Sequence, residues 1–241
     1  MKAGSLLDTI SPLTLKTNPM NIKAYSILSL SLLLSCSCYA QTSSGRYARI
    51  VTIGPHQGKS AEFTAGYKRH IQWHRDNKDP WTWFGWTIVL GPRLGYFMDG
   101  TFGHDQAELD HPIKPAEDAA DNNTNVAPYA DFLSHGIYER VDGLSKGPVL
   151  PDTSPYLIVN SYQVNLGAET KFEQAIARFN DARLTTYRLK TGGTEASYVL
   201  FRAGSKFSDA AVVADLQIEP GVVASATSEL FRYQAAMSHA P

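Results

Sequence analysis

Two histidines four residues apart, His70 and His74, are the side chains whose type and spacing most directly suggest chemistry. An i, i+4 pair on one face of a helix can present two imidazoles to one metal ion. An imidazole can also act as a general base, because its pKa lies close to physiological pH. A structural interpretation competes with both: His70 fills the apolar stripe of a helix, and His74 interacts with the dipole at the helix end.

The sequence does not identify a third metal ligand, because the two histidines are not part of an H-E-x-x-H pattern. His104, which follows Gly103 at the end of a predicted strand, and Asp99 are the residues that could complete a group. No motif predicts a cofactor, although haem or a divalent metal could be held by His70, His74 or His104. In a metal-free enzyme, His70 and His104 are the candidate catalytic residues.

Aromatic residues form a second candidate site. Four tryptophans are concentrated between residues 73 and 86. Large rings on a strand that faces a barrel can wall a pocket for a small apolar or aromatic ligand, with tyrosine hydroxyls at its rim. An ordinary core is the competing interpretation, because aromatic residues are common in strands whatever the function. The candidate ligand-binding residues are Trp83, Tyr96, Tyr162, Tyr187 and Tyr198.

The composition argues against several classes of function. Basic and acidic side chains are nearly balanced, 22 against 23, and no basic stripe appears, so we expect no nucleic-acid partner. No G-x-S-x-G elbow marks an activated serine, and Gly192-Gly193 is typical of a hairpin turn. The acidic, asparagine-rich stretch 116–125 lacks the spacing of an EF-hand loop, and we predict that it is a solvated surface connection.

An internal repeat organises the rest of the chain. In each half a strand precedes a helix that opens on a similar hexapeptide, GKSAEF at 58–63 and GAETKF at 167–172. The helices are predicted to run to about Asn77 and Arg183, and a strand pair, a variable connection and a last strand follow each. The predicted segments are a first repeat at 45–147, a linker at 148–155 and a second repeat at 156–241.

This order of elements is that of the ferredoxin-like unit. The predicted strand at 82–90 carries apolar residues on both faces, so both faces must be covered. Packing the two sheets against each other covers the second face. We therefore predict an α+β fold with two tandem ferredoxin-like βαββ(α)β repeats packed sheet to sheet.

The tandem arrangement resembles the dimeric α/β-barrel superfamily, whose members include antibiotic-biosynthesis monooxygenases, NIPSNAP proteins, muconolactone isomerases and chlorite dismutases. The string DPWTWFGW at 79–86, followed by Gly91-Pro92, is similar to a segment of exported bacterial proteins near NIPSNAP. The resemblance covers about residues 45–240 and implies a dimeric α/β-barrel-type domain. It implies no particular activity, and the haem-ligand segment of chlorite dismutases has no match in the second repeat.

Three classes of function therefore stay open. The first is a periplasmic protein that binds a small ligand or a partner. The second is a cofactor-independent monooxygenase or isomerase that acts on a small aromatic substrate. The third is a haem- or metal-binding protein. A homodimer that associates through outer surfaces is compatible with all three.

The first 40 residues have the pattern of a secretory signal peptide, with Met20 as the expected start. An apolar run from Tyr25 to Ser35 is followed by a small-residue exit, and cleavage before Gln41 would leave no cysteine in a periplasmic or secreted protein. Alternatively, Cys36 becomes the lipidated first residue of an outer-membrane lipoprotein. The run of about 11 residues is shorter than the roughly 20 that a membrane-spanning helix needs.

Overall fold

A computed structural model describes residues 45–148, 153–212 and 216–241. They belong to a unit that spans Ser43–Pro241, which alone is described below. The predicted signal segment 1–40, with Cys36, lies outside the described residues, as do residues 149–152 of the predicted linker. Among the described residues, no helix has the length and apolar character needed to span a bilayer.

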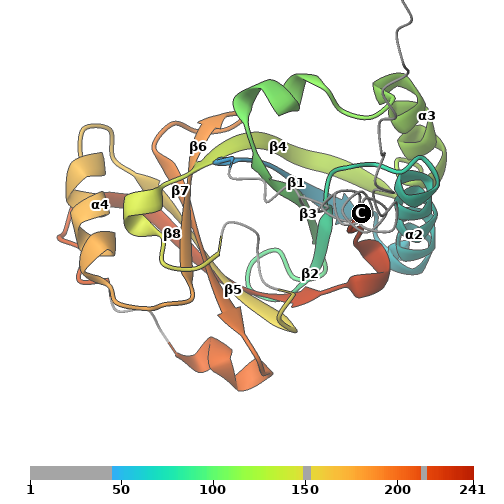
Figure 1. Ribbon diagram of the computed structural model, residues 1–241. Helices are drawn as coiled ribbons and strands as arrows, with labels where there is room; N and C mark the ends of the chain where they lie inside the picture. Colours follow the sequence, from blue (N-terminus) through green and yellow to red (C-terminus); the bar gives the residue numbers. More distant parts are fainter. Residues whose placement is uncertain (1–44, 149–152, 213–215) are drawn as a thin grey trace, which may run out of the picture. The chain divides into compact units, whose positions relative to one another are not determined.

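The two halves of the unit share the order strand, helix, strand, strand, strand, and the first half adds the helix α3 before its last strand (Figure 1). The first half contains β1 (Tyr47–Pro55), α2 (Ser60–Asp76), β2 (Phe84–Leu90), β3 (Phe97–His104), α3 (Pro115–Asn125) and β4 (Ala130–Arg140). The second half contains β5 (Tyr156–Val164), α4 (Glu169–Arg178), β6 (Leu184–Thr191), β7 (Ser197–Gly204) and β8 (Val223–Tyr233). Short 3-10 turns lie at η2 (Gln106–Asp110), η3 (Asp142–Leu144), η4 (Phe207–Ala211) and η5 (Ala235–Met237).

The strands form one closed antiparallel barrel in the order β1-β3-β2-β8-β5-β7-β6-β4. Each half contributes four neighbouring strands in the ferredoxin-like order, β4-β1-β3-β2 and β8-β5-β7-β6. The halves are joined where β2 pairs with β8 and where β4 pairs with β6. The predicted fold class, two tandem ferredoxin-like repeats in a dimeric α/β-barrel-type arrangement, is confirmed.

Three hydrophobic clusters follow from the two faces of this sheet. The barrel interior is filled with side chains from both halves, including Trp86, Phe102 and Phe231. On the outer face, α2 covers the first half and α4 covers the second. Phe63 and Phe172 are each the fourth residue of their helix, and both are buried against the sheet. Burial of each ring contributes about 1.5–3 kcal/mol.

The two covering helices differ in length, at 17 residues for α2 and 10 for α4. The prediction that the second helix reaches Arg183 was wrong. Phe179 adopts extended backbone directly after Arg178, and the Asp181 carboxylate then accepts the backbone N–H of Arg183 in a turn. Helix α2 continues through the positions that would correspond to this turn, and His70 and His74 lie in that extension.

The stretch 116–125 was predicted to be a surface connection, but it lies within the helix α3. Pro115 starts this helix and Glu117 and Asp118 occupy its first turn, where a negative charge is favourable. None of its residues is buried, so α3 is held against α2 through polar contacts. Arg69 Nε donates to Asn125 Oδ1 at 2.7 Å. Gly66 allows this approach, because a Cβ there would lie 1.8 Å from the Asn125 carbonyl oxygen.

Candidate metal centre

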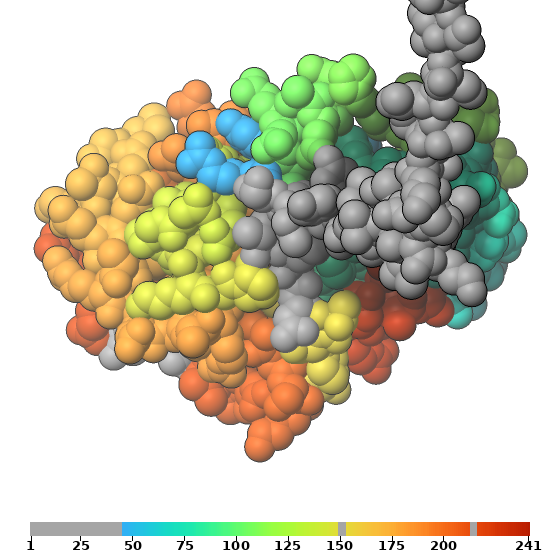
Figure 2. Space-filling model, in the orientation of Figure 1, coloured from blue at the N-terminus to red at the C-terminus, as the bar shows by residue number. Residues whose placement is uncertain are grey.

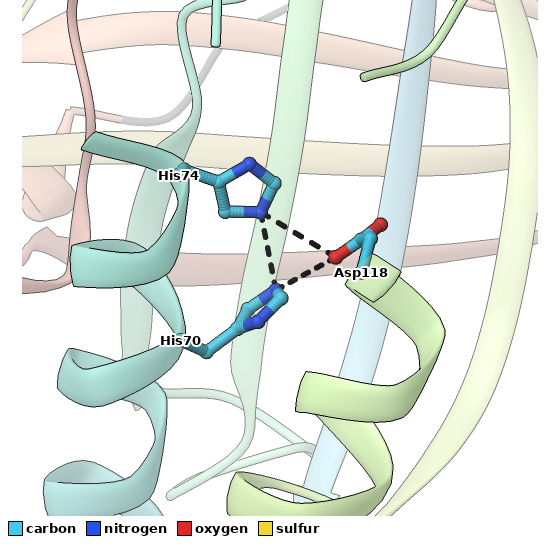
Figure 3. A group of neighbouring side chains, drawn as sticks. All are labelled: His70, His74 and Asp118. Carbon is cyan, nitrogen blue, oxygen red and sulfur yellow. Dashed lines mark hydrogen bonds and ion pairs between the residues drawn. The ribbon is translucent and has the colours of Figure 1, made fainter. Parts of the chain in front are cut away.

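Two neighbouring helices bring together three metal-ligating side chains outside the barrel (Figure 3). His70 and His74 project from the last turns of α2, and Asp118 projects toward them from the first turn of α3. Both imidazoles are buried, at 5% and 3% exposure. The i, i+4 spacing places the two rings on one helix face, as the sequence predicts.

The donor atoms of the three side chains converge on one point. The two Nε2 atoms of His70 and His74 are 3.2 Å apart. Asp118 Oδ1 lies 3.5 Å from the first and 3.7 Å from the second. Atoms bound to one tetrahedral ion at about 2.1 Å are separated by about 3.4 Å. The observed spacing therefore matches that of three ligands around one ion.

A second set of carboxylates fixes the orientation of both rings. Asp121 Oδ2 is 2.8 Å from His70 Nδ1, and Asp79 Oδ2 is 2.6 Å from His74 Nδ1. A carboxylate can only accept, so each Nδ1 carries the proton and each Nε2 presents its lone pair. Histidines that bind metals are commonly oriented in this way by an acidic partner. The centre thus holds three acceptor atoms whenever both rings are neutral.

Asp79 is the best-anchored of these carboxylates, with 1% of its side chain exposed. The Trp81 backbone N–H and the Trp83 indole N–H both donate to it at 2.9 Å. Burial works to raise the pKa of Asp79, but the hydrogen bonds from His74, Trp81 and Trp83 outweigh it and the pKa lies below its usual range. Asp79 therefore stays ionised and holds His74 in one tautomer.

An added proton on His70 is disfavoured. Burial and the neighbouring His74 lower the pKa of His70 below its ordinary value, although Asp118 and Asp121 act in the opposite direction. At neutral pH the His70 ring is therefore available as a ligand, and it places no proton between the two Nε2 atoms.

A cavity of about 60 Å³ opens onto the three donor atoms. A water molecule needs about 10–15 Å³ on such a measure, so the cavity holds a few waters or a very small ligand. Its walls include Tyr67, Trp83 and Asp99. Asp99 is 9% exposed, and its Oδ1 has no hydrogen-bond partner among the described residues. Burial raises the pKa of Asp99 to about 6, against the effects of Tyr67 and Arg49.

Arg49 brings a positive charge to the same cavity. Its guanidinium lies over the Trp83 ring, 5.5 Å from the ring centre, and its Nε donates to His135 Nε2. Among the described residues, neither terminal nitrogen of Arg49 has a hydrogen-bond partner, and Arg49 and Asp99 form no ion pair within 4 Å. The cavity thus offers an unpaired cationic donor and an unpaired acceptor.

The residues proposed from sequence do not form one site. His104 lies outside the metal-ligating group, since its Nε2 hydrogen-bonds with Thr101 Oγ1 at 2.6 Å and its ring packs on Trp81. Of the aromatic candidates, Trp83 lies at the metal centre and Tyr96 and Tyr187 at the barrel interior. Tyr162 and Tyr198 pack on the outer face beside α4.

Sequence reasoning missed Asp118 and Asp121 because the acidic stretch has no apolar periodicity. Pro115 followed by an acidic first turn is nevertheless a helix-start signal, and the i, i+3 spacing places Asp118 and Asp121 on one helix face. Arg49 and His135 had no such signal, because only the barrel brings β1 and β4 together.

Comparison with known proteins supports the fold alone. No protein-family model matches the chain, and no curated protein matches it. A candidate monooxygenase from Lactobacillus acidophilus is 10% identical and covers 78% of this chain and 94% of its own, with a TM-score of 0.50. A chlorite dismutase variant from Candidatus Nitrospira defluvii is 11% identical and covers 80% and 93%, with a TM-score of 0.52. A candidate chlorite dismutase is also 11% identical and covers 79% and 95%, with a TM-score of 0.52. The chain therefore has the barrel fold of these proteins.

Proposed function

We propose that this protein binds one divalent transition-metal ion through His70 Nε2, His74 Nε2 and Asp118 Oδ1. One observation carries the proposal: His70 Nε2, His74 Nε2 and Asp118 Oδ1 lie 3.2–3.7 Å apart, while carboxylates occupy the Nδ1 sides of both rings. Lone pairs at this spacing repel one another in a buried site, and a cation at their centre removes the repulsion.

The donor set indicates which ions would bind. Imidazole suits zinc, iron, copper and nickel, whereas calcium and magnesium prefer sites made of oxygen atoms only. Haem does not fit here, because the two Nε2 atoms face each other at 3.2 Å and leave no room for a porphyrin. The site therefore favours a bare ion such as Zn²⁺ or Fe²⁺.

Three protein ligands leave at least one coordination position for water or substrate, which is typical of catalytic rather than structural centres. The cavity beside the three donors supports this assignment. Two histidines and one carboxylate with open positions are also the ligands of non-haem iron oxygenases, and a candidate monooxygenase shares the fold. We therefore infer a metal-dependent enzyme and take oxygenation as the first activity to test.

Isothermal titration of metal-free protein with Zn²⁺, and separately with Fe²⁺ under anaerobic conditions, tests the proposal. We expect one ion per chain for the wild type and no binding for His70→Ala. His104→Ala is the matched control, because this buried histidine lies outside the group. Equal binding by wild type and His70→Ala would contradict the proposal.

A second candidate function rests on a separate cavity of about 240 Å³ in the second half, lined by Leu157, Tyr187 and Phe201. Its size and apolar walls suit a small aromatic ligand. Ala203 also lines it, so Ala203→Leu should fill the space. Loss of toluene binding in this variant would support the assignment, and unchanged binding would exclude it.

We also propose that the protein acts outside the cytoplasm after removal of residues 1–40. The apolar run and small-residue exit at the N-terminus support this. Intact mass of the exported protein distinguishes cleavage before Gln41 from a lipidated chain that begins at Cys36.

A further inference from the structure

We propose that the open side of the metal centre binds a small 2-hydroxycarboxylate. Its carboxylate would pair with Arg49, and its hydroxyl would coordinate the ion and donate to Asp99. This inference rests on the proposed function, since the hydroxyl oxygen needs the ion.

Arg49 would recognise the carboxylate group of the acid. Trp83 and His135 hold its guanidinium, so the group is oriented without an ion pair in place. Within the part of the chain that the structure describes, its two terminal nitrogens donate to no partner, and Arg49 lines the cavity. A planar carboxylate accepts two parallel hydrogen bonds from such a fork, which a neutral carbonyl cannot do as strongly.

Asp99 would recognise the hydroxyl group of the acid. A buried carboxylate oxygen without a partner among the described residues is costly, and Asp99 lines the cavity, from which a ligand can reach it. The partner must be a donor, so a hydroxyl fits where a ketone oxygen or a hydrogen atom on carbon does not.

The charge that faces the cavity agrees with a monoanion. A divalent ion and Arg49 contribute three positive charges, and Asp99 and Asp118 contribute two negative ones. Asp79 and Asp121 lie behind the imidazoles, on their Nδ1 sides. These groups sum to about +1 at the open face, whereas the whole centre with Asp79 and Asp121 sums to about −1, so Arg49 and the ion are the groups that attract the carboxylate. The small volume limits the acid to about two or three carbons.

Three small, related probes separate the two contacts in calorimetric titrations of zinc-loaded protein. Glycolate carries both groups, acetate lacks the hydroxyl, and methyl glycolate lacks the charge. We expect glycolate to bind about tenfold to a hundredfold more tightly than either, because each lost contact is a hydrogen bond to a charged group. Arg49→Gln should remove the preference over methyl glycolate, and Asp99→Leu, which offers no acceptor, should remove the preference over acetate.

Metal content and melting temperature are measured for every variant, and Arg188→Gln, on a partly exposed arginine of the second half, is the control. Arg49→Lys keeps the charge without the fork and should bind glycolate with intermediate affinity. Equal affinity for glycolate and acetate, tighter binding of inorganic phosphate, or an unchanged preference in Arg49→Gln would each overturn the inference. A wild type that takes up no zinc would instead refute the proposed function itself.

Discussion

The two halves of this protein share a frame and differ in what they place on its outer face. In both, a four-stranded sheet in the same order is covered by one helix whose fourth residue, Phe63 or Phe172, is buried. In the first half the covering helix continues and carries two imidazoles whose Nδ1 atoms face carboxylates. In the second half the helix stops at Arg178, and Arg183 occupies the sequence position that corresponds to His74.

The cluster at this place in the second half contains two guanidinium groups and one carboxylate. Arg183 Nη2 lies 2.9 Å from Asp181 Oδ2, and buried Arg202 approaches the same carboxylate at 3.7 Å. A guanidinium remains protonated at all relevant pH values, so this cluster repels cations. Imidazole at neutral pH offers a lone pair instead. The same sheet and covering helix can therefore support an arginine–carboxylate cluster in one half and a candidate metal centre in the other. The difference depends on whether the helix region carries arginine or histidine.

The largest expected effect is on the free energy of unfolding, and it tests whether the covering helix packs on the sheet in the same way in both halves. Phe63→Ala and Phe172→Ala should each lower the free energy of unfolding by about 3–5 kcal/mol, because each leaves a cavity beneath its helix. Urea unfolding measured by circular dichroism gives both values. A cost below about 1 kcal/mol for one variant, beside a full cost for the other, would break the equivalence of the two halves.

The next effect tests the difference between the halves. His74→Ala should weaken Zn²⁺ binding by more than about 100-fold, since the loss of a ligand exceeds the 10–100-fold cost typical of an outer partner. Arg183→Ala, at the corresponding distance from the second-half phenylalanine, should leave zinc affinity unchanged. Similar losses in both variants, measured by competition with a chelating dye, would contradict the account.

A smaller effect is expected from the carboxylates behind the rings. Asp79→Asn and Asp121→Asn should each weaken zinc binding by about 10–100-fold, because an amide no longer fixes the tautomer of the histidine. Asp79→Asn should also destabilise the metal-free protein, since Asp79 accepts from Trp81 and Trp83 as well. Asp181→Asn is the control in the second half. If zinc affinity is the same in all three variants, the carboxylates do not orient the rings.

The smallest effect is a difference in pH dependence. Burial lowers the pKa of His104 despite the opposing charges of Glu108 and Asp79. The unfolded chain therefore binds the proton better, and stability is lost as pH falls below about 6.5. In the second half the hydrogen bond from Arg183 lowers the pKa of Asp181, so its contribution is present above about 3.9 and is lost only as pH falls through that value.

Urea titrations of metal-free protein between pH 7 and pH 5 check this difference. His104→Asn should reduce the loss of stability over this range, and Asp181→Asn should leave it unchanged. A wild-type slope retained by His104→Asn would show that His104 is not the titrating group.

Much of the fold was predictable because its signals are local and repeated. The tandem hexapeptides fixed the repeat, and the stripe of Phe63, Tyr67 and His70 fixed the first helix. The end of the second helix was not predictable from periodicity, because Phe179 continues the apolar stripe even though its backbone is extended. Composition also misled at 116–125, since a helix held by polar contacts alone has no apolar stripe to detect.

The candidate metal centre was half predictable for the same reason. His70 and His74 are near each other in sequence, and their spacing reveals their shared face. Asp118 and Asp121 reach them from another helix, 51 residues away in the case of Asp121. His104 was a wrong completion of the metal group, because its strand places it beside Thr101 and Trp81. Long-range placement of this kind depends on the packing of α3 on α2.

Anomalous diffraction from a crystal of zinc-loaded protein, recorded on both sides of the zinc absorption edge, shows directly whether an ion binds between α2 and α3. We expect one strong peak per chain, within about 2.0–2.2 Å of His70 Nε2, His74 Nε2 and Asp118 Oδ1. We also expect no peak beside Asp181 and Arg183 in the second half. A fully loaded crystal whose peak lies elsewhere, or which has no peak between α2 and α3, would contradict the proposed metal centre.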